Sequence, residues 1–430
     1  MVPTIDMAKL FAARGVKATG SINSWPIITT PCTAPLVSKI VDRTRTLGIN
    51  IEIQIIKFPT VEAGLPEGCE NVDLVNSPDM FPTIFMATKM LQQPHEQLLQ
   101  EYQPSCLVAD ACFPWDLFFS LVASHAMRQY EPYKKASFDS ETFVIPNFPG
   151  EIKLIRNQLP HFTQQEVETD FTKLLKEAAE LELRSYGFVE SFYDLKPDYA
   201  DHYRKVLGRK AWHMGPVSLW GKEASIDEHE CLKWLAKLSD SQLIKIANSI
   251  VYICFGTIAK LSDSQLIKIA MGKNEKEEEG WSPKGFEKRM EGKELNIRDW
   301  APQVLILDHE AVGGFVTHCG WNSTLEGVTA GLPMITWPMA TEQFYNEKLV
   351  TEVLKIGVGV GAHQWIKVMV DDIKKEAIEE AVKLSMVGDE AEEISRAKAL
   401  GKMAKRLPEV FISLTSSYID ADALMEELKS

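Results

Sequence analysis

One stretch of this chain, residues 300–343, restricts the possible fold more than any other. It reads WAPQVLILDHEAVGGFVTHCGWNSTLEGVTAGLPMITWPMATEQ. An apolar run at 313–317 leads through His318 to the polar triplet 322–324. A short run of β-branched and aromatic residues bounded by glycines is typical of a buried parallel strand, and polar residues placed like this triplet are typical of a helix start. The stretch therefore predicts a strand, a tight turn and a helix.

The turn in this stretch has the features of an anion-binding site. A helix N-terminus offers unpaired backbone N–H groups and a partial positive charge, and both favour phosphate. His318 at the end of the strand and the side chains of Asn322 and Ser323 add hydrogen-bond donors. Glu326, about one helical turn further on, has an acceptor for ribose hydroxyls, and Trp300 has a flat face for a base. These residues predict a nucleotide diphosphate ligand rather than a bare phosphate.

The same residues resemble the signature box of the plant secondary-product UDP-glycosyltransferases, the family 1 glycosyltransferases. The resemblance lies in the pattern Trp…His-Cys-Gly-Trp-Asn-Ser…Glu…Glu-Gln. It implies an α/β fold of the GT-B type, with two Rossmann-like domains facing each other across a cleft. The resemblance implies that Trp300 stacks on uracil, that Ala301 and Gln303 contact it through their backbones, and that Glu326 binds the ribose. It further implies that the diphosphate is held by His318, Asn322 and Ser323, and the sugar by Glu342 and Gln343. Trp321 is also counted among the donor-binding residues. In this family, Gln at the last position is the usual choice for glucose.

Four candidate donor-site residues have plainer alternatives. Trp300 and Trp321 are also what a hydrophobic core contains, and His318 is also compatible with a buried structural histidine. Thr257 follows the expected strand at 250–256, where the family has Ser or Thr near the diphosphate, but a turn residue without a ligand explains it as well. A Rossmann dehydrogenase is disfavoured because no Gly-x-Gly-x-x-Gly follows a strand.

The start of the chain departs from the family pattern. Residues 4–14 have helical spacing, whereas an α/β domain begins with a buried strand. In the family, a strand and a loop ending in Gly-His come before the matching residues, and that His is the catalytic base. We therefore expect the N-terminal domain to lack its first strand, with the base position immediately before Met1. Asp110, after an expected strand at 105–109, matches the carboxylate that orients this base, with a helix cap as the alternative.

Two further features interrupt the family pattern. The segment 236–247 recurs identically at 259–270, and each copy is predicted to start a helix capped by Ser239 or Ser262. A helix-and-strand unit after Trp115 and an internal strand after Gly272 are expected to be missing. Loss of an internal strand breaks two ladders of backbone hydrogen bonds, so a neighbour must replace it or the domain is damaged.

The resemblance, together with the strand and helix patterns, implies the domain division. We predict an acceptor-binding domain at 1–217, a linker at 218–248, a UDP-sugar-binding domain at 249–410 and a C-terminal helix at 411–430 that returns to the first domain. Expected strands lie at 27–30, 51–58 and 357–361, and expected helices at 36–47, 82–102, 370–386 and 390–406. A chain of 430 residues is long enough for two such domains.

Composition restricts the partners and the compartment. The net charge of −14 argues against a nucleic-acid partner. An odd number of cysteines, seven, without a Cys-x-x-Cys pair predicts reduced thiols and a cytoplasmic protein. No apolar run reaches the roughly 18 residues of a membrane span. We expect a monomer that binds a UDP-sugar donor and a small-molecule acceptor. UDP-glucose is a co-substrate, so no cofactor is expected, and no metal is expected either.

Together these patterns predict a UDP-glucosyltransferase. It would transfer glucose, with inversion, from UDP-glucose to a hydroxyl of a flavonoid, another phenolic or a triterpenoid, forming a β-glucoside. The alternative is a catalytically silent UDP-sugar-binding protein, because the family's catalytic His is absent from this chain. A silent protein would lose donor-site residues as readily as whole segments. The signature box that carries these residues is intact, which favours the transferase.

Overall fold

The structure is a computed structural model of the chain. It describes residues 7–8, 25–46, 51–71, 74–75, 77, 80–103, 118–159, 169–170, 172–174, 176–177, 180, 187–213, 215–219, 230–240, 250–256, 295, 297, 301–340, 342–364, 373–387 and 391–410.

A four-stranded parallel sheet organises the C-terminal part of the chain. Its strands are β7 (Ile250–Cys254), β8 (Val312–Thr317), β9 (Met334–Thr336) and β10 (Gly357–Gly359), in the order β10-β9-β8-β7. Between and after them come α12 (Gln303–Leu307), α13 (Trp321–Ala330), α14 (Gln343–Lys348), the π-helical turn η8 (Leu349–Val353), α15 (Lys375–Val387) and α16 (Ala391–Val410). The predicted strand, turn and helix at 313–324 are confirmed as β8 followed by α13.

Side chains of the sheet alternate between two hydrophobic clusters, one on each face. Phe315 of β8 packs in the cluster that contains Leu325 of α13, whereas the next residue, Val316, packs in the cluster that contains Ile378 of α15. Successive side chains of a strand point to opposite faces, so both faces of this sheet are covered by helices. This arrangement explains why the strands are apolar without alternation, with all six residues of β8 buried.

The N-terminal part is built around two shorter pairs of parallel strands. The first pair is β1 (Trp25–Thr29) with β2 (Ile51–Ile55), accompanied by α2 (Ala34–Thr46), α3 (Met80–Lys89) and α4 (Gln92–Tyr102). The second pair is β5 (Gly187–Val189) with β6 (Ala211–His213), accompanied by α5 (Phe118–Tyr130) and α8 (Pro197–Asp201). An antiparallel pair joins β3 (Thr142–Val144) to β4 (Lys153–Ile155). Short helical turns are η2 (Pro132–Lys135), η3 (Arg156–Gln158), η4 (Tyr193–Leu195), η5 (His202–Val206) and η6 (Val217–Leu219).

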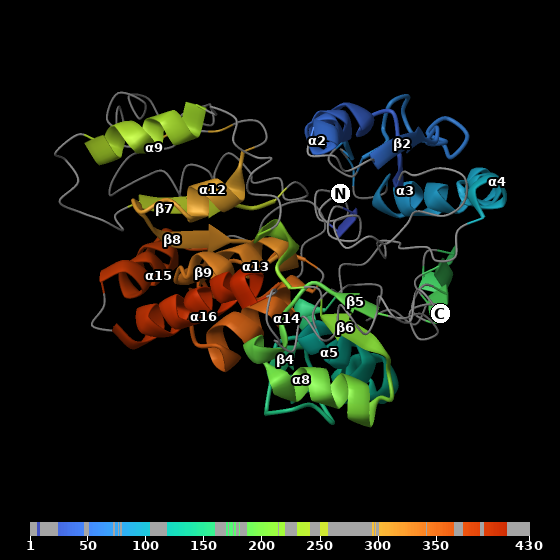
Figure 1. Cartoon of the computed structure of the whole chain (residues 1–430). Helices are drawn as coiled ribbons and strands as arrows, with labels where there is room; N and C mark the ends of the chain where they lie inside the picture. Colours follow the sequence, from blue (N-terminus) through green and yellow to red (C-terminus); the bar gives the residue numbers. More distant parts are fainter. Residues whose placement is uncertain are drawn as a thin grey trace, which may run out of the picture.

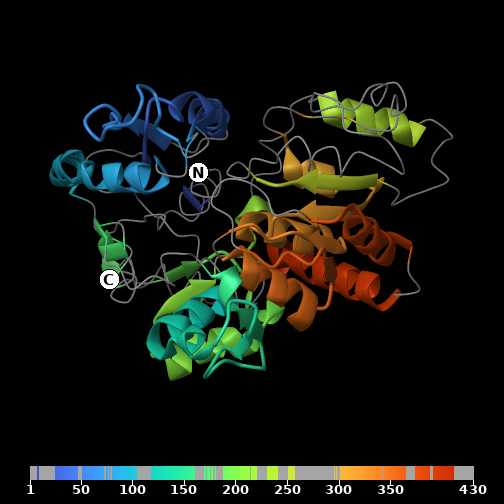
Figure 2. The same ribbon diagram turned by 180° about the vertical axis from the view of Figure 1, so that it is seen from behind.

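The two parts lie side by side, as both views show (Figures 1 and 2). The lower N-terminal elements, α5, α8, β5 and β6, lie next to α14 of the C-terminal part, and α5 packs against α14. One hydrophobic cluster runs through this contact, because Phe119 of α5 and Leu349 of η8 belong to it together. The contact brings the start of α5 close to the turn that follows β8.

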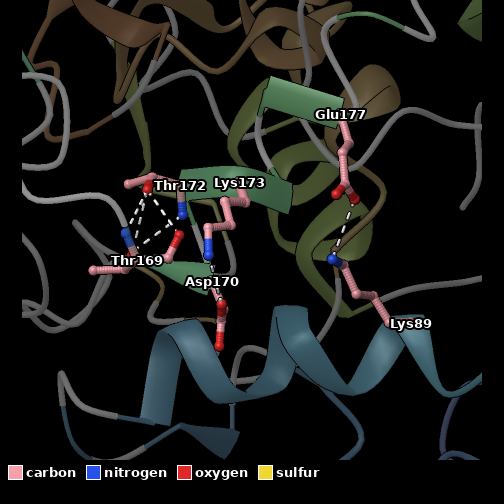
Figure 3. Close-up of polar contacts among 6 residues, drawn as sticks. All are labelled: Lys89, Thr169, Asp170, Thr172, Lys173 and Glu177. Carbon is pink, nitrogen blue, oxygen red and sulfur yellow. Dashed lines mark hydrogen bonds and ion pairs between the residues drawn. The ribbon is translucent and has the colours of Figure 1, made fainter.

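Residues 169–170, 172–174 and 176–177 lie beside α3 and are tied to it by an ion pair (Figure 3). Thr169 and Thr172 exchange hydrogen bonds, with Thr172 N–H donating to Thr169 Oγ1 at 3.1 Å. Lys89 of α3 reaches Glu177 at 3.2 Å, and both side chains are more than a third exposed. An exposed ion pair of this kind adds little stability.

The structure corrects two predictions about helices. The helix predicted at 82–102 is two helices, α3 and α4, separated at Met90 and Leu91. Ser239 is not an N-cap, because it lies near the end of α9 (Glu230–Asp240), which occupies part of the predicted linker and packs against α12. Helix α9 begins earlier than the repeat because Cys231 and Leu235 are buried in the core and so fix its apolar face.

Other predictions are confirmed or lie beyond the described residues. Strands β1, β2 and β10 and helices α2, α15 and α16 occur where they were expected, with ends shifted by a few residues. The strand at 105–109, the second copy of the repeat and the C-terminal helix at 411–430 lie outside the described residues. None of the helices described here combines the length and apolar character that crossing a membrane requires.

Candidate functional site

The turn between β8 and α13 presents an open helix N-terminus. Gly320 is the N-cap residue, and no side chain caps the helix. The first backbone bond of the helix runs from Thr324 N–H to the Gly320 carbonyl at 2.9 Å. The N–H groups of the preceding residues, 321–323, therefore belong to the unpaired set of a helix start. This is the anion-binding geometry that the sequence predicts.

His318 lies beside this helix start, and two glycines leave room for its ring. A Cβ atom on Gly256 would lie 2.7 Å from His318 Nε2, and one on Gly320 would overlap the same nitrogen. Nδ1 of His318 is buried and has no hydrogen-bond partner among the described residues. Burial lowers the pKa of His318 to about 4, although a hydrogen bond with the Cys254 backbone acts in the opposite direction. At neutral pH the imidazole is therefore uncharged, and its buried Nδ1 is a ring nitrogen without a partner among the described residues.

A side-chain network connects the start of α12 to α13. Nε2 of Gln303 donates to Ser323 Oγ at 3.0 Å and to Glu326 Oε2 at 2.7 Å. The resemblance assigns Gln303 a backbone role only, so the sequence did not indicate this side-chain role. The network fixes the Glu326 carboxylate, the predicted ribose acceptor, beside the first turn of α13. Asn322 is exposed next to it, and Ala301 is partly buried at the entry to α12.

The predicted sugar-binding pair lies at the start of α14. Glu342 is 2% exposed and Gln343 is 8% exposed. Oε1 of Gln343 accepts from the backbone N–H groups of Met339 and Ala340, at 2.9 and 3.0 Å. Its amide nitrogen is therefore the group that can serve a sugar hydroxyl. Glu342 is close enough to Cys319 to raise the pKa of that thiol, after burial and Glu347, so the pair lies next to the His318 turn.

One predicted donor-binding residue has a different role in the structure. The side chain of Trp321 is 2% exposed and belongs to the hydrophobic core. Its indole N–H donates to the Glu190 carbonyl at 2.7 Å, which joins the two parts of the chain. The Trp321 side chain therefore belongs to the core, as the plainer alternative has it, and only the backbone N–H of this residue lies at the open helix start. The assignment of Trp321 to the donor site stays a prediction. An aromatic residue in a motif carries no sign of which way its ring points, so the sequence could not distinguish the two roles.

Three predicted site residues, Asp110, Thr257 and Trp300, lie outside the described residues and stay predictions. Two histidines of the acceptor part are described. His213 is 1% exposed and its Nδ1 lies 3.1 Å from an Arg204 nitrogen. Burial and nearby cations, Arg128 first among them, lower the pKa of His125. Arg204 occupies one ring nitrogen of His213, so this residue is poorly placed to act as a base.

Comparisons with known proteins agree with this geometry. The family model described as "UDP-glucoronosyl and UDP-glucosyl transferase" matches residues 233–396. The scopoletin glucosyltransferase of Nicotiana tabacum is 47% identical over 471 residues, which cover 100% of this chain and 95% of that protein. The UDP-glucose flavonoid 3-O-glucosyltransferase 7 of Fragaria ananassa is 48% identical, over 99% of this chain and 93% of its own length. The first alignment is longer than the 430 residues of this chain, so that relative contains segments that have no counterpart here.

Solved structures share the fold. UGT73P12 of Glycyrrhiza uralensis, complexed with glycyrrhetinic acid 3-O-monoglucuronide, is 34% identical with a TM-score of 0.84, over 99% of this chain and 92% of that one. UGT71G1 of Medicago truncatula, complexed with UDP-glucose, has a TM-score of 0.73 at 21% identity, over 100% of this chain and 95% of that one, and shows the fold alone. The GT-B type of α/β fold predicted from the sequence is confirmed. The alternative of a catalytically silent protein gains no support from relatives that are named as transferases.

Proposed function

Because this chain belongs to the plant family 1 UDP-glycosyltransferases, we propose that it transfers glucose from UDP-glucose to a hydroxyl of a small plant metabolite. The acceptor classes are flavonoids, other phenolics and triterpenoids, and the product is a β-glucoside. The observation that carries the proposal is the uncapped start of α13 beside His318, whose Nδ1 has no partner among the described residues. These groups are the donors that a diphosphate requires.

The donor half of the reaction depends on residues around the turn after β8. The start of α13, the partial positive end of a helix, and the side chains of His318 and Asn322 hold the diphosphate. As the bond to the anomeric carbon breaks, negative charge grows on the UDP leaving group, and these fixed donors stabilise it. Since they supply that charge stabilisation, the proposed reaction is metal-free. Glu326 holds the ribose, with Gln303 fixing its carboxylate.

The remaining donor contacts are proposed from the family pattern. Trp300 stacks on the base, Ala301 contributes through its backbone, and Thr257 lies near the diphosphate. Glu342 and the amide nitrogen of Gln343 hold the sugar hydroxyls. In this arrangement the acceptor approaches the anomeric carbon on the face opposite UDP, so the configuration inverts.

The acceptor half needs a base that removes the proton of the attacking hydroxyl. We propose that Asp110 is the carboxylate that orients the family's catalytic His, a residue that this sequence does not contain, and that it stabilises the protonated form of that His, as the carboxylate of a catalytic triad does. A positioned base contributes roughly a hundredfold to ten-thousandfold. We also propose the domain limits 1–217 and 249–410, with 218–248 between them and 411–430 returning to the first domain, and a cytoplasmic monomer.

The test is a donor-binding titration followed by turnover. UDP is titrated into the purified chain by calorimetry, and UDP-glucose is then offered with scopoletin or a flavonol as acceptor. We expect UDP to bind, and the acceptor to gain one hexose by mass spectrometry. Glu326→Ala should weaken UDP binding, whereas Glu310→Ala, an exposed change in the turn between α12 and β8, should not.

Two outcomes would contradict the proposal. A folded protein that does not bind UDP would show that the proposed donor site does not function. A protein that binds UDP and releases no UDP from UDP-glucose with any phenolic acceptor would contradict the transferase activity. Asp110→Ala tests the acceptor half separately, because it should abolish turnover and leave UDP affinity unchanged.

A further inference from the structure

The side chain of Asn346 on α14 joins the two parts of the chain through two hydrogen bonds. Ser120 Oγ of α5 donates to Asn346 Oδ1 at 2.9 Å. Asn346 Nδ2 donates to the Cys319 carbonyl at 2.9 Å. Ser120 is 1% exposed, and Asn346 and Cys319 are fully buried. Loss of a buried hydrogen bond lowers stability strongly, because the groups left unpaired remain removed from water without a partner.

The residue at the end of this chain of bonds has an unusual backbone. Cys319 lies between His318 and Gly320, and its φ is +65°. A residue with a Cβ is rarely found in this left-handed region, and it persists there when surrounding contacts fix it. Three contacts hold Cys319: its N–H donates to Thr317 Oγ1 at 3.2 Å, its thiol donates to the Thr317 carbonyl at 3.7 Å, and its carbonyl accepts from Asn346. The first two contacts are local, whereas the third depends on α14.

The conformation of Cys319 decides the geometry of the donor site. On one side it directs the ring of His318, and on the other it leads through Gly320 into the first turn of α13. A rotation of this backbone would move both groups that are proposed to hold the diphosphate. The Asn346 amide therefore acts on the donor site without touching the donor.

We propose that Asn346 is a positioning residue, which transmits the position of α5 to the donor-binding turn through Ser120 and the Cys319 carbonyl. The bond from Trp321 to the Glu190 carbonyl is a second tie between the same turn and the N-terminal part. Since both ties start from the acceptor part, the donor site takes its full shape only when the two parts are packed together. This inference rests on the proposed function, because it assigns a role in that reaction.

The experiment uses the full chain and three single substitutions. Ser120→Ala removes the tie to α5 and leaves the bond from Asn346 to Cys319. Asn346→Asp keeps an acceptor for Ser120 and loses the donor to Cys319. Ser124→Ala is the matched control, because Ser124 is buried one turn further along α5 and its Oγ has no partner among the described residues. UDP affinity is measured by calorimetry at a temperature at which circular dichroism shows every variant to be folded.

We expect Ser120→Ala to raise the Kd for UDP roughly threefold to tenfold, the size of one hydrogen bond, and Asn346→Asp to raise it further. Ser124→Ala should leave the Kd unchanged. In the Asn346→Asp background, Ser120→Ala should add little, because the path to Cys319 is already broken. A purely structural role would lower the thermal midpoint and leave the Kd of the folded variants unchanged.

The outcomes separate this inference from the proposed function. If the folded wild-type chain does not bind UDP, the proposed function fails and this inference fails with it. If the wild type binds UDP but Ser120→Ala matches Ser124→Ala, or the two substitutions have additive effects on the Kd, the inference alone is overturned. Ser120→Ala keeps the test decisive if Asn346→Asp does not fold, since it removes only one hydroxyl.

Discussion

Gln303 Nε2 donates to Glu326 Oε2 at 2.7 Å and so joins the start of α12 to the second turn of α13. The same nitrogen lies 3.0 Å from Ser323 Oγ. A hydrogen bond to an ionised carboxylate is stronger than one between neutral groups. The glutamine therefore restricts the orientation of the Glu326 carboxylate.

Removal of the Gln303 side chain should weaken donor binding even though this side chain is not proposed to contact the uracil ring. We expect Gln303→Ala to raise the Kd for UDP roughly tenfold, in the same direction as Glu326→Ala. The double substitution should cost little more than Glu326→Ala alone, because the glutamine acts through the glutamate. Calorimetric titration of the four proteins measures this coupling. Fully additive losses would show instead that Gln303 and Glu326 serve the ligand independently.

Gly320→Ala should disturb the site by steric overlap alone. The φ of Gly320 is −58°, which alanine also adopts, but a Cβ there would overlap Nε2 of His318. We expect the imidazole to be displaced, with a loss of UDP affinity and a lower thermal midpoint. In a His318→Ala background the same change should leave the thermal midpoint almost unchanged, since the overlapping atom is gone. Thermal unfolding of the single and double variants measures this, and an equal drop in both backgrounds would place the strain elsewhere.

Part of the site could be predicted from the sequence because strand, turn and helix are local patterns. The apolar run of β8 and the polar start of α13 are read from neighbouring residues, so the anion-binding turn was found. The resemblance then assigned roles by position, but it did not indicate which way a side chain points. Trp321 therefore received a ligand role although its indole N–H serves Glu190.

Contacts between distant residues explain most of what the sequence did not indicate. Ser120 and Asn346 are 226 positions apart, and nothing in either local pattern predicts their hydrogen bond. The break between α3 and α4 was also not predicted, although Pro94 in the first turn of α4 signals it: proline has no N–H for the Met90 carbonyl, and its ring clashes with that carbonyl. Burial of Cys231 fixed the start of α9, which the repeated segment alone placed too late.

Glu347 should make the stability of the protein depend on pH. Burial raises the pKa of this carboxyl to about 7, although Lys348 and the hydrogen bond from Thr336 act in the opposite direction. A raised pKa means that the folded state holds the proton more tightly than the unfolded chain does. The stabilisation is complete below the unfolded pKa of about 4.5 and is lost as the pH rises to about 7.

Glu347→Gln should remove this dependence while keeping the acceptor for Thr336. We expect the variant to exceed the wild type in free energy of unfolding at pH 8, by up to about 3 kcal/mol, and to match it near pH 5. Urea unfolding at the two pH values measures the difference. Glu380→Gln, an exposed change in α15, is the control and should stay within about 0.5 kcal/mol of the wild type. A gain that is equal at both pH values would exclude titration of Glu347 as its cause.

Gly401 in α16 tests whether helix propensity or packing decides stability where α16 crosses the end of α13. In an exposed helix interior, glycine to alanine stabilises by about 1 kcal/mol. Here a Cβ on Gly401 would lie 2.6 Å from the Gly331 Cα and 2.8 Å from its nitrogen, and these are backbone atoms that cannot rotate away. Gly331 itself ends α13 with φ +77°, so its backbone has little freedom to adapt.

We therefore expect Gly401→Ala to destabilise the protein by about 1–3 kcal/mol, the usual cost of overpacking, against the sign of its propensity. The adjacent exposed change Lys402→Ala should be nearly neutral, since lysine and alanine differ little in helix propensity. Urea unfolding of both variants measures the two effects. A more stable Gly401→Ala protein would mean that the two helices can separate at this crossing without loss, and that the close approach of Gly331 and Gly401 does not hold α16 against α13.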